Sequence, residues 1–576
     1  MKRFLTAVCL LIIVLAICLP GLGARDFWPP DEARYGEVSR ELLQGAPLFL
    51  PHLNRRIYPD KPPGFFWCVA GLKRLGGESL NMEAATRLPS VIGAAALVLL
   101  VGLWIAGICG PRGGLMAGLL LSGSLLFLWQ ARQAQLDMLF AALIGGMIAV
   151  FHRSVTGDRP RLALLGFLLL FLAVFVKGPV AFLGLLVIMV HVLVLRRPGA
   201  FFHRWSLLGF LVFGTLVAGW LFMAWRTAEA LEPGGGNAWL DAAVWRQTAE
   251  RAREGKAHLK PWFAYLLRLP IDLMPFTPFL LLLGLGRVRR AIPDAARPLM
   301  RFALLWLGVF VVVMSCFPGK REIYLLPVFP AAAMLVFLAV EGAARVMPRV
   351  LTAYAGFLGG LLLLAGEAAL VLAFRPELFS EGISRLRSAT WSAPLPPPGG
   401  FLQPGSAWAE AFRSHLLLFG ACLLAPALAT LALALAGAPR AAVGWAALTF
   451  ALALGVGSAV LLPDANALSS RRPVGEMVRR HRPTAGEGPV GILRHMDEGV
   501  LFYAGPPLPE VAARLEASQA EEAREEVRRY LSRPGALLIA REKDLRRFGL
   551  VAGRDHVILE RYPLRRRIFA LLGARR

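Results

Sequence analysis

The chain alternates between long apolar runs and short polar connectors. Near-continuous apolar residues fill the stretches 1–21, 88–108, 162–176, 180–195, 207–222, 276–285, 302–316, 323–340, 351–374, 416–436 and 441–462. A bilayer core of about 30 Å is crossed by roughly 20 apolar residues in a helix. The pattern therefore predicts a polytopic α-helical membrane protein.

The apolar segment 115–150 is too long for one crossing, and the polar interruption QARQAQ at 130–135 divides it into two predicted helices. Counting one crossing for each other run, we expect about 13 transmembrane helices. The first run follows Lys2 and Arg3 and also fits a cleaved signal peptide. We favour an uncleaved first helix because a polar motif follows it directly and many further crossings come after.

Composition supports the membrane assignment and narrows the function. Of the 576 residues, 56% are hydrophobic and 18% are charged, whereas about a quarter of a soluble chain is charged. The net charge of +25 fits basic residues that anchor helix ends at an anionic lipid surface. No nucleic-acid-binding pattern accompanies that charge, so nucleic acid is not an expected partner. The six cysteines lack CxxC spacing and are typical of small hydrophobic residues.

The distribution of charge predicts which side each connector faces. With Lys2 on the cytoplasmic side, short arginine-rich connectors such as 196–204 and 287–301 fall inside, as the positive-inside tendency requires. The loop 22–85 and the tail 463–576 then fall outside. We expect surface helices in that first loop, because its residues 36–43 have amphipathic spacing.

The tail differs in composition from the rest of the chain, which predicts two domains. Residues 1–462 form the membrane domain, and 463–576 form a soluble C-terminal α/β domain on the outer side. Helical spacing and i,i+4 Glu–Arg pairs predict a helix within 509–531. Short apolar stretches predict strands around it, at 489–493, 500–503 and 536–539.

Unusual polar residues collect on the predicted outer side. A charged side chain in hydrocarbon costs at least about 3 kcal/mol, so ionisable residues at helix ends facing a cavity are functional candidates. An interfacial anchor is the ordinary alternative for any one of them, but here they converge on one face. The candidates are Asp31, Glu32, Asp60, Lys61, Asp137, His258, Lys320, Arg321 and Tyr324.

Six motifs in fixed order carry a family resemblance over roughly residues 1–340. They are PPDEARYGEVSRELL, PHLNRRIYPDKPPGFFW, ATRLPSVIG, QLDMLFA, VKGP and GKREIYLLPVFP. Together they resemble bacterial GT-C glycosyltransferases of family 39, a group that includes 4-amino-4-deoxy-L-arabinose (lipid A) transferases and protein O-mannosyltransferases. The resemblance implies an enzyme of the inner membrane that takes a sugar from undecaprenyl phosphate and transfers it at the periplasmic face.

The resemblance also implies roles for the candidate residues. Lys61 and Tyr324 match positions that contact the lipid phosphate, with Lys320 or Arg321 assisting. Asp31 and Asp137 match a pair of carboxylates that act on donor and acceptor, and Glu32, beside the first of them, is a third predicted catalytic residue. Developing negative charge on a phosphate leaving group requires cationic and hydrogen-bonding partners of this kind.

A divalent metal, zinc, is a further implication of the resemblance. Asp60 and His258 match two zinc-binding positions of the arabinose transferases, with aspartate here in place of glutamate. Carboxylate and imidazole groups are ordinary zinc ligands. His481 and His495 are both candidates for a third ligand.

The sequence leaves the acceptor and the sugar open. Lipid A or another envelope glycolipid is the expected acceptor, and an aminosugar is one expected donor sugar. A protein hydroxyl, as in an O-mannosyltransferase, is the alternative within this class. A polytopic lipid or sugar transporter is the alternative from another class, but such proteins usually have repeated halves with charges near the midplane, which this chain lacks.

Overall fold

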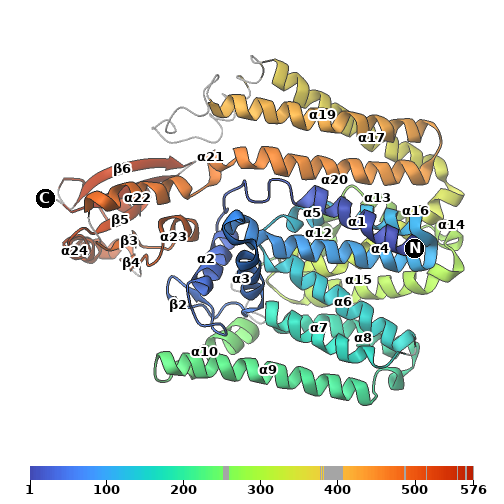
Figure 1. The fold of residues 1–576 in the computed structure, drawn as a ribbon, viewed down its shortest axis with the longest axis horizontal. Helices are drawn as coiled ribbons and strands as arrows, with labels where there is room; N and C mark the ends of the chain where they lie inside the picture. Colours follow the sequence, from blue (N-terminus) through green and yellow to red (C-terminus); the bar gives the residue numbers. More distant parts are fainter. Residues whose placement is uncertain are drawn as a thin grey trace.

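Figure 1 shows a computed structural model of the chain, in which long helices form a bundle and a small α/β unit lies at one end. The described residues are 1–576 without 158, 251–258, 376–377, 379–380, 382–406, 486–487, 514, 554–555, 565–566 and 575–576. The N-terminus lies at the far end of the bundle from the α/β unit (Figure 1). This arrangement confirms the predicted fold class.

The bundle is built mostly from long apolar helices. Its helices are α1 (Lys2–Cys18), α4 (Met82–Ser122), α5 (Leu125–Ala131), α6 (Leu136–Thr156), α7 (Leu162–Lys177), α8 (Phe182–Leu195), α9 (Arg204–Leu231), α10 (Gly235–Leu240), α12 (Ala264–Asp272), α13 (Thr277–Leu282), α14 (Gly286–Ala291), α15 (Arg297–Cys316), α16 (Phe329–Val346), α17 (Pro348–Phe374), α19 (Ala407–Leu435) and α20 (Pro439–Asp464). The predicted break at 130–135 separates α5 from α6.

Eight helices in the described part of the chain are long and apolar enough to cross a membrane, and two shorter apolar helices accompany them. One of the eight, α4, has a non-helical residue at Gly110 (φ +82°). Pro111 follows it and disfavours helical geometry at the preceding residue, so α4 is divided into two segments. The count of about 13 crossings stays a prediction. It is reached if α4 crosses twice and α1, α7, α8 and the α12–α13 pair each cross once.

The loop after α1 contains two helices, α2 (Asp31–Leu43) and α3 (Gly64–Gly76), and a short hairpin of β1 (His52–Leu53) and β2 (Arg56–Ile57). Aromatic side chains join these helices, because Tyr35 packs edge-on against Phe65 and Phe66. The loop is therefore a packed structure with its own buried side chains, and it can hold polar residues in fixed positions.

The C-terminal unit contains a five-stranded mixed sheet in the order β4-β3-β5-β7-β6. Its elements are α21 (Asn466–Ser469), α22 (Arg472–Ala485), β3 (Val490–Leu493), α23 (Glu498–Ala504), β4 (Glu510–Val511), α24 (Ala520–Leu531), β5 (Leu537–Arg541), α25 (Glu542–Arg547), β6 (Val557–Leu564) and β7 (Arg567–Gly573). Strands β4, β3 and β5 are parallel, whereas β7 is antiparallel to β5 and β6.

Two details of the tail differ from the sequence prediction. Residues 500–503, predicted as a strand, lie in helix α23, where the Asp497 side chain caps the helix by accepting a hydrogen bond from Val500. The predicted helix over 509–531 is formed only from Ala520 onward, and its first residues pair as β4 instead. Short apolar runs of this length do not distinguish strands from buried helices, which explains the first error.

The C-terminal unit is joined to the first loop by specific contacts. The Tyr503 hydroxyl accepts a hydrogen bond from the Phe27 amide (2.9 Å) and donates one to Glu83 (3.1 Å). Arg472 lies 2.7 Å from carboxylate oxygens of both Asp26 and Glu83. The unit is therefore fixed against the segment that leads into α2.

Candidate active site

The carboxylate of Asp31 lies at the start of α2 and is paired with two arginines. Arg321 Nη2 donates a 3.0 Å hydrogen bond to Asp31 Oδ2, and Arg34 Nη1 lies 3.7 Å from Oδ1. The position suits an acid, because the N-terminus of a helix favours negative charge. The Asp31 side chain is 14% exposed and that of Arg321 is 29% exposed, so this pair is accessible to a ligand.

Asp137 lies in the first turn of α6 and forms a buried ion pair with Lys177, the last residue of α7. The Lys177 ammonium also lies over two aromatic rings, 4.7 Å from the centre of Tyr324 and 5.0 Å from that of Phe140. A lysine held between a carboxylate and aromatic faces is largely desolvated, which strengthens its attraction for anions.

The Asp31 and Asp137 groups belong to one electrostatic cluster. Burial lowers the pKa of the Arg321 guanidinium, but Asp31, Tyr324 and Asp137 outweigh burial and raise that pKa. Burial also raises the pKa of the Tyr35 hydroxyl, and Asp31 and Asp137 add to that increase. Side chains from α2, α6, α7 and the segment before α16 therefore meet at one place.

The catalytic role of Glu32 stays a prediction, and the contacts of this residue in the structure are those of a structural anchor. Its carboxylate is 3% exposed and accepts hydrogen bonds from Arg25 (2.8 Å), from Arg87 twice (3.0 Å each), and from the amides of Trp28 and Ala134. A carboxylate has about four acceptor positions, so this one is fully occupied. Burial would raise the pKa of Glu32, but Arg87 and Arg25 lower it to about 2. Glu32 is an anchor that fixes the N-terminus of α2.

The phosphate-assisting role of Lys320 also stays a prediction, and the contacts of this residue in the structure lie within its own loop. The residue is 2% exposed, and its ammonium donates hydrogen bonds to the backbone carbonyls of Phe317 and Lys260. Tyr265 supports the same turn by donating to the Arg321 carbonyl at 3.2 Å. Lys320 therefore shapes the loop that presents Arg321, while Arg321 itself faces Asp31.

The segment of Tyr58, Asp60 and Lys61 lies beside α2. Burial raises the pKa of the Tyr58 hydroxyl, the nearby Asp60 raises it further, and a hydrogen bond with Arg34 opposes both. Asp60 and Lys61 are half-buried. Asp60, the chain neighbour of the predicted phosphate ligand Lys61, and the predicted carboxylate Asp31 thus both lie near Tyr58.

A zinc site stays a prediction. Within the part of the chain that the structure describes, no group of three or more His, Cys, Asp or Glu side chains is arranged to hold a metal. His258 lies outside the described residues. His481, one candidate third ligand, lies 3.6 Å from Glu560 within the C-terminal unit. Of the predicted ligands, Asp60, His481 and His495 lie within the described residues, and no step below depends on a metal.

Sequence reasoning missed Lys177, Arg34 and Glu498. Arg34 reaches from α2 to the C-terminal unit and donates to Glu498 Oε1 through Nε (3.2 Å) and Nη2 (2.5 Å). Lys177 was present in the VKGP motif, and a lysine closing an otherwise apolar helix was the available signal. Glu498 had no such signal, because its partner lies 464 residues away.

The chain is similar to several known proteins. The family of dolichyl-phosphate-mannose-protein mannosyltransferases matches residues 60–225. The undecaprenyl phosphate-α-4-amino-4-deoxy-L-arabinose arabinosyl transferase of Pseudomonas aeruginosa is 29% identical over 390 residues, which cover 66% of this chain and 68% of that protein. A protein of the same name from Sodalis glossinidius is 30% identical over 357 residues, 60% of each chain.

The fold has a close match among solved structures. The crystal structure of ArnT from Cupriavidus metallidurans bound to undecaprenyl phosphate has a TM-score of 0.70 at 18% identity, over 99% of this chain and 97% of that one. Its apo form gives a TM-score of 0.71. The chain resembles GT-C glycosyltransferases of family 39. The predicted resemblance, the fold class and the enzyme class of a glycosyltransferase are thereby confirmed.

Proposed function

We propose that this GT-C glycosyltransferase moves a sugar from undecaprenyl phosphate to an acceptor at the periplasmic face of the inner membrane, with lipid A or another envelope glycolipid as that acceptor. The names of the Pseudomonas and Sodalis relatives support the donor, as does the solved ArnT complex. The cluster of paired charges around Asp31, Arg321, Asp137 and Lys177 carries the proposal.

Each part of the cluster has a chemical role in this reaction. In the transfer, the bond between the anomeric carbon and the phosphate oxygen breaks, and a bond to the acceptor oxygen forms. The lipid phosphate leaves with negative charge, which Lys61, Tyr324, Arg321 and Lys177 can stabilise. A hydroxyl acceptor must also lose a proton, for which Asp31 or Asp137 is the base. A phosphate acceptor is already anionic and needs only to be oriented.

The ion pair between Asp31 and Arg321 supports an exchange of partners when the donor binds. Arg321 is engaged by a carboxylate, and the phosphate of the donor is a competing partner of the same charge. Arginine binds phosphate through two parallel hydrogen bonds, at least as well as it binds carboxylate. When the phosphate takes Arg321, Asp31 is released next to the reacting sugar.

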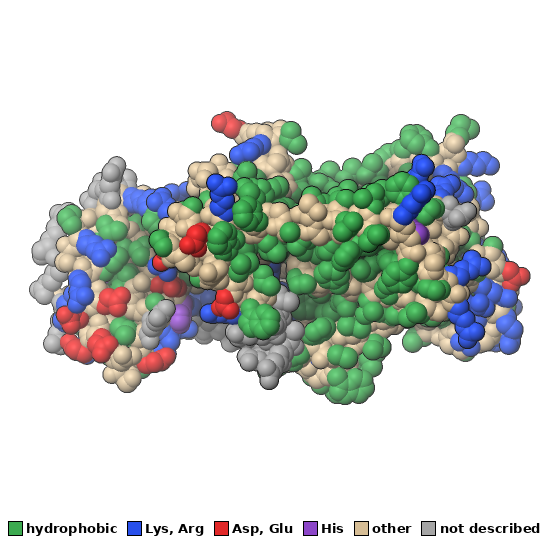
Figure 2. All heavy atoms as spheres, turned by 90° about the horizontal axis from the view of Figure 1, so that it is seen from below, with side chains coloured by type: hydrophobic (Ala, Val, Ile, Leu, Met, Phe, Trp, Pro, Cys, Tyr) green, Lys and Arg blue, Asp and Glu red, His purple; other side chains and the backbone are tan. Residues whose placement is uncertain are grey.

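The surface of the bundle supports the membrane orientation. Figure 2 shows a broad hydrophobic surface over the helices, with Lys and Arg gathered at the end away from the C-terminal unit and both signs of charge on that unit. Exposed arginines of the connectors include Arg196, Arg197, Arg287, Arg289 and Arg290. The positive-inside tendency favours that end as cytoplasmic, and the cluster as periplasmic.

The test is transfer by the purified full chain in liposomes, with a radiolabelled sugar on undecaprenyl phosphate as donor. Lipid A and a serine- and threonine-rich peptide are offered as separate acceptors. The proposal expects label on the glycolipid, whereas label on the peptide supports the second candidate, which the match to protein mannosyltransferases favours. Mass spectrometry of lipid A and envelope glycans from a deletion strain identifies the sugar. The proposal is contradicted if neither acceptor becomes labelled and the donor keeps all of its labelled sugar.

A further inference from the structure

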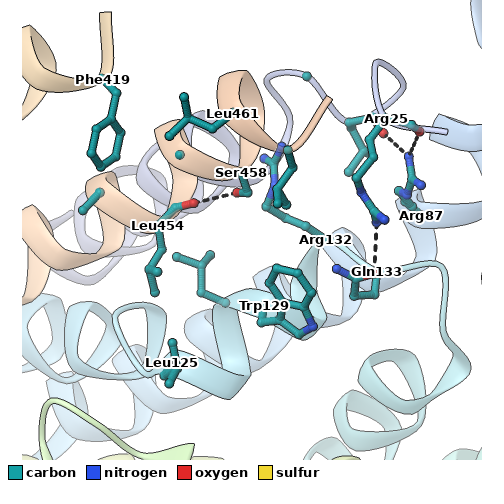
Figure 3. Close-up of a pocket in the computed structure, with 16 residues that line it drawn as sticks. Arg25, Arg87, Leu125, Trp129, Arg132, Gln133, Phe419, Leu454, Ser458 and Leu461 are labelled. Atoms are coloured by element: carbon teal, nitrogen blue, oxygen red, sulfur yellow. Dashed lines mark hydrogen bonds between the residues drawn. The ribbon is translucent and has the colours of Figure 1, made fainter. Parts of the chain in front are cut away.

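A cavity of about 320 Å³ lies beside the candidate active site, between the ends of α1 and α5 and the outer part of α20 (Figure 3). Neither Asp31 nor Asp137 lines it. One part of its wall is apolar and comes from α5, α19 and α20, through residues such as Leu125, Leu454 and Leu461. Arginine side chains form another part of the wall, so the cavity combines the two surfaces of a lipid site.

Three of the lining residues are buried arginines. Arg25, Arg87 and Arg132 are 4%, 1% and 6% exposed. Arg132 donates to backbone carbonyls at the end of α1, those of Ile17, Cys18 and Pro20. Their side chains therefore come from the first loop, the start of α4 and the turn after α5.

These arginines carry more positive charge than their described ion pairs neutralise. Arg25 and Arg87 both pair with the single carboxylate of Glu32, and the described partners of Arg132 are carbonyls. Buried charge is costly unless an opposite charge compensates it. Burial lowers the pKa of Arg25 to about 10; Glu32 opposes this decrease, whereas the nearby Arg87 and Arg132 add to it. An anion in the cavity would relieve that repulsion.

One hydrogen-bond donor at this wall is left over. Arg25 Nη2 donates to Glu32 (2.8 Å) and to Gln133 (3.0 Å), and the guanidinium lies 4.4 Å above the Trp28 ring. Nη1 of the same group is buried and has no hydrogen-bond partner in the described part of the chain. A buried donor without an acceptor costs about 1–3 kcal/mol. The orphaned group and the excess charge both indicate a missing anion.

We propose that this cavity binds the phosphate group of a lipid, with the adjoining acyl chain along the apolar wall of α5 and α20. A free phosphate ion gains nothing from the leucines, and a neutral lipid gains nothing from three arginines. Arginine is the residue best suited to hold a phosphate, because its planar group forms two parallel hydrogen bonds. A volume near 300 Å³ fits the smaller ligand pockets of proteins, which is enough for a head group and the start of a chain.

The site is connected to the candidate active site through Glu32. Its carboxylate binds Arg25 and Arg87 at the cavity, and its chain neighbour Asp31 binds Arg321. The occupant is either an acidic phospholipid of the bulk membrane or a phosphorylated glycolipid, and the shared chemistry is phosphate on an acyl lipid. The inference goes beyond the proposed function and holds independently of it, since the test below measures binding without turnover.

The test measures lipid binding to the delipidated full chain by native mass spectrometry. Phosphatidylglycerol, lipid A and diacylglycerol are titrated separately, the last as a lipid without phosphate. Ser458→Phe fills the cavity from α20. The Ser458 hydroxyl bonds only carbonyls of its own helix, Leu454 and Gly455, among the described contacts, so its loss breaks no link between elements. Ser458→Ala keeps the cavity open, and Gly444→Phe adds the same ring on α20 where a side chain meets nothing within 4 Å.

We expect at least one phosphorylated lipid to bind the wild type, Ser458→Ala and Gly444→Phe alike, and to bind Ser458→Phe at least 10-fold more weakly. Arg25→Lys should weaken the same lipid while leaving diacylglycerol binding unchanged. The preferred lipid identifies the occupant of the cavity. Preference for phosphatidylglycerol indicates a phospholipid of the bulk membrane, and preference for lipid A indicates a phosphorylated glycolipid. Leu454→Trp is the second blocking variant should Ser458→Phe fail to fold. Equal binding by a folded blocking variant, or diacylglycerol binding as tight as that of the phosphorylated lipids, would overturn the proposal.

Discussion

Arg321 and Asp31 are 290 positions apart in the chain, yet their side chains form an ion pair with 3.0 Å between Nη2 and Oδ2. Both residues come from polar motifs that flank apolar runs, and only the fold brings them together. The pair places a carboxylate and a cation that we propose binds phosphate at the same point, which suits transfer from a lipid phosphate.

Asp31→Asn should lower the rate of sugar transfer at least about 100-fold, the lower end of a general-base contribution. Stability should stay close to that of the wild type, because the amide oxygen can still accept a hydrogen bond from Arg321 and the site is partly exposed. Single-turnover transfer and thermal unfolding of the same preparation check both parts. An unchanged transfer rate would remove Asp31 from the mechanism.

Asp137→Asn should also abolish transfer, but with a loss of stability. Lys177, its partner, is only 13% exposed, and removing one member of a buried ion pair typically costs about 3–5 kcal/mol. Lys177→Met combined with Asp137→Asn should restore much of the thermal stability without restoring activity. If Asp137→Asn unfolds at the wild-type temperature, Lys177 is solvated and the pair is not buried as described.

Lys61→Ala should weaken the binding of undecaprenyl phosphate itself. The prolines that follow Lys61 restrict the backbone and hold the lysine at a fixed height, and the residue is half-buried. A charge-assisted hydrogen bond to the phosphate is worth about 1.5–3 kcal/mol, so affinity should fall roughly 10- to 100-fold. Binding is measured on purified protein by displacement of a labelled polyprenyl phosphate.

Lys320→Ala is a comparison for stability and not a control for phosphate affinity, because Lys320 holds the loop that presents Arg321. Lys320→Ala removes hydrogen bonds to the Phe317 and Lys260 carbonyls in a buried loop, so it should lower thermal stability. Equal affinity of Lys61→Ala and the wild type would make Lys61 an interfacial anchor.

The membrane fold could be predicted from the sequence because a helix that crosses the bilayer must consist of a long run of apolar residues. The break between α5 and α6 and the helical character of most runs follow from that requirement. The helical structure of residues 500–503 could not be predicted in this way, because a four-residue apolar stretch fits both a strand and the helix that Asp497 caps. Strands β6 and β7 were also missed. In β6 the charged residues Glu560 and Arg561 interrupt the apolar pattern, and the short apolar run of β7 fits a strand or a buried helix equally well.

The candidate site was predicted only in part, for a different reason. Sequence shows which residues are ionisable but not how many partners each finds in three dimensions. Glu32 and Asp31 are neighbours with the same chemistry, yet five hydrogen bonds immobilise Glu32 while Asp31 faces Arg321. The difference arises from contacts with Arg25 and Arg87, and no local spacing encodes it.

Glu37 should make stability depend on pH in a definite direction. Burial raises the pKa of this carboxyl to about 7, with Glu41 adding to the increase and Arg40 opposing it. An acid with a raised folded-state pKa binds more protons folded than unfolded, so stability is highest below the unfolded pKa and falls as pH rises towards 7. Glu37→Gln should flatten the thermal unfolding temperature between pH 5 and 7. A wild-type curve that rises over this interval while the variant stays flat contradicts the assignment.

Glu498→Gln should lower transfer although the residue lies in the C-terminal unit. Its carboxylate accepts two hydrogen bonds from Arg34. Arg34 in turn lies 3.7 Å from Asp31 and forms a further hydrogen bond with Tyr58. Burial lowers the pKa of Arg34, but Glu498 outweighs it and raises that pKa, so the pair is strongly coupled. Losing the charge of Glu498 should loosen Arg34 and reduce kcat several-fold, with little change in donor affinity.

Glu560→Gln is the control for this prediction. It breaks a more exposed pair with Arg480 in the same unit and should transfer at the wild-type rate. In a double-mutant cycle, Arg34→Gln and Glu498→Gln should be non-additive. Additive effects would mean that the C-terminal unit acts on the site by another route.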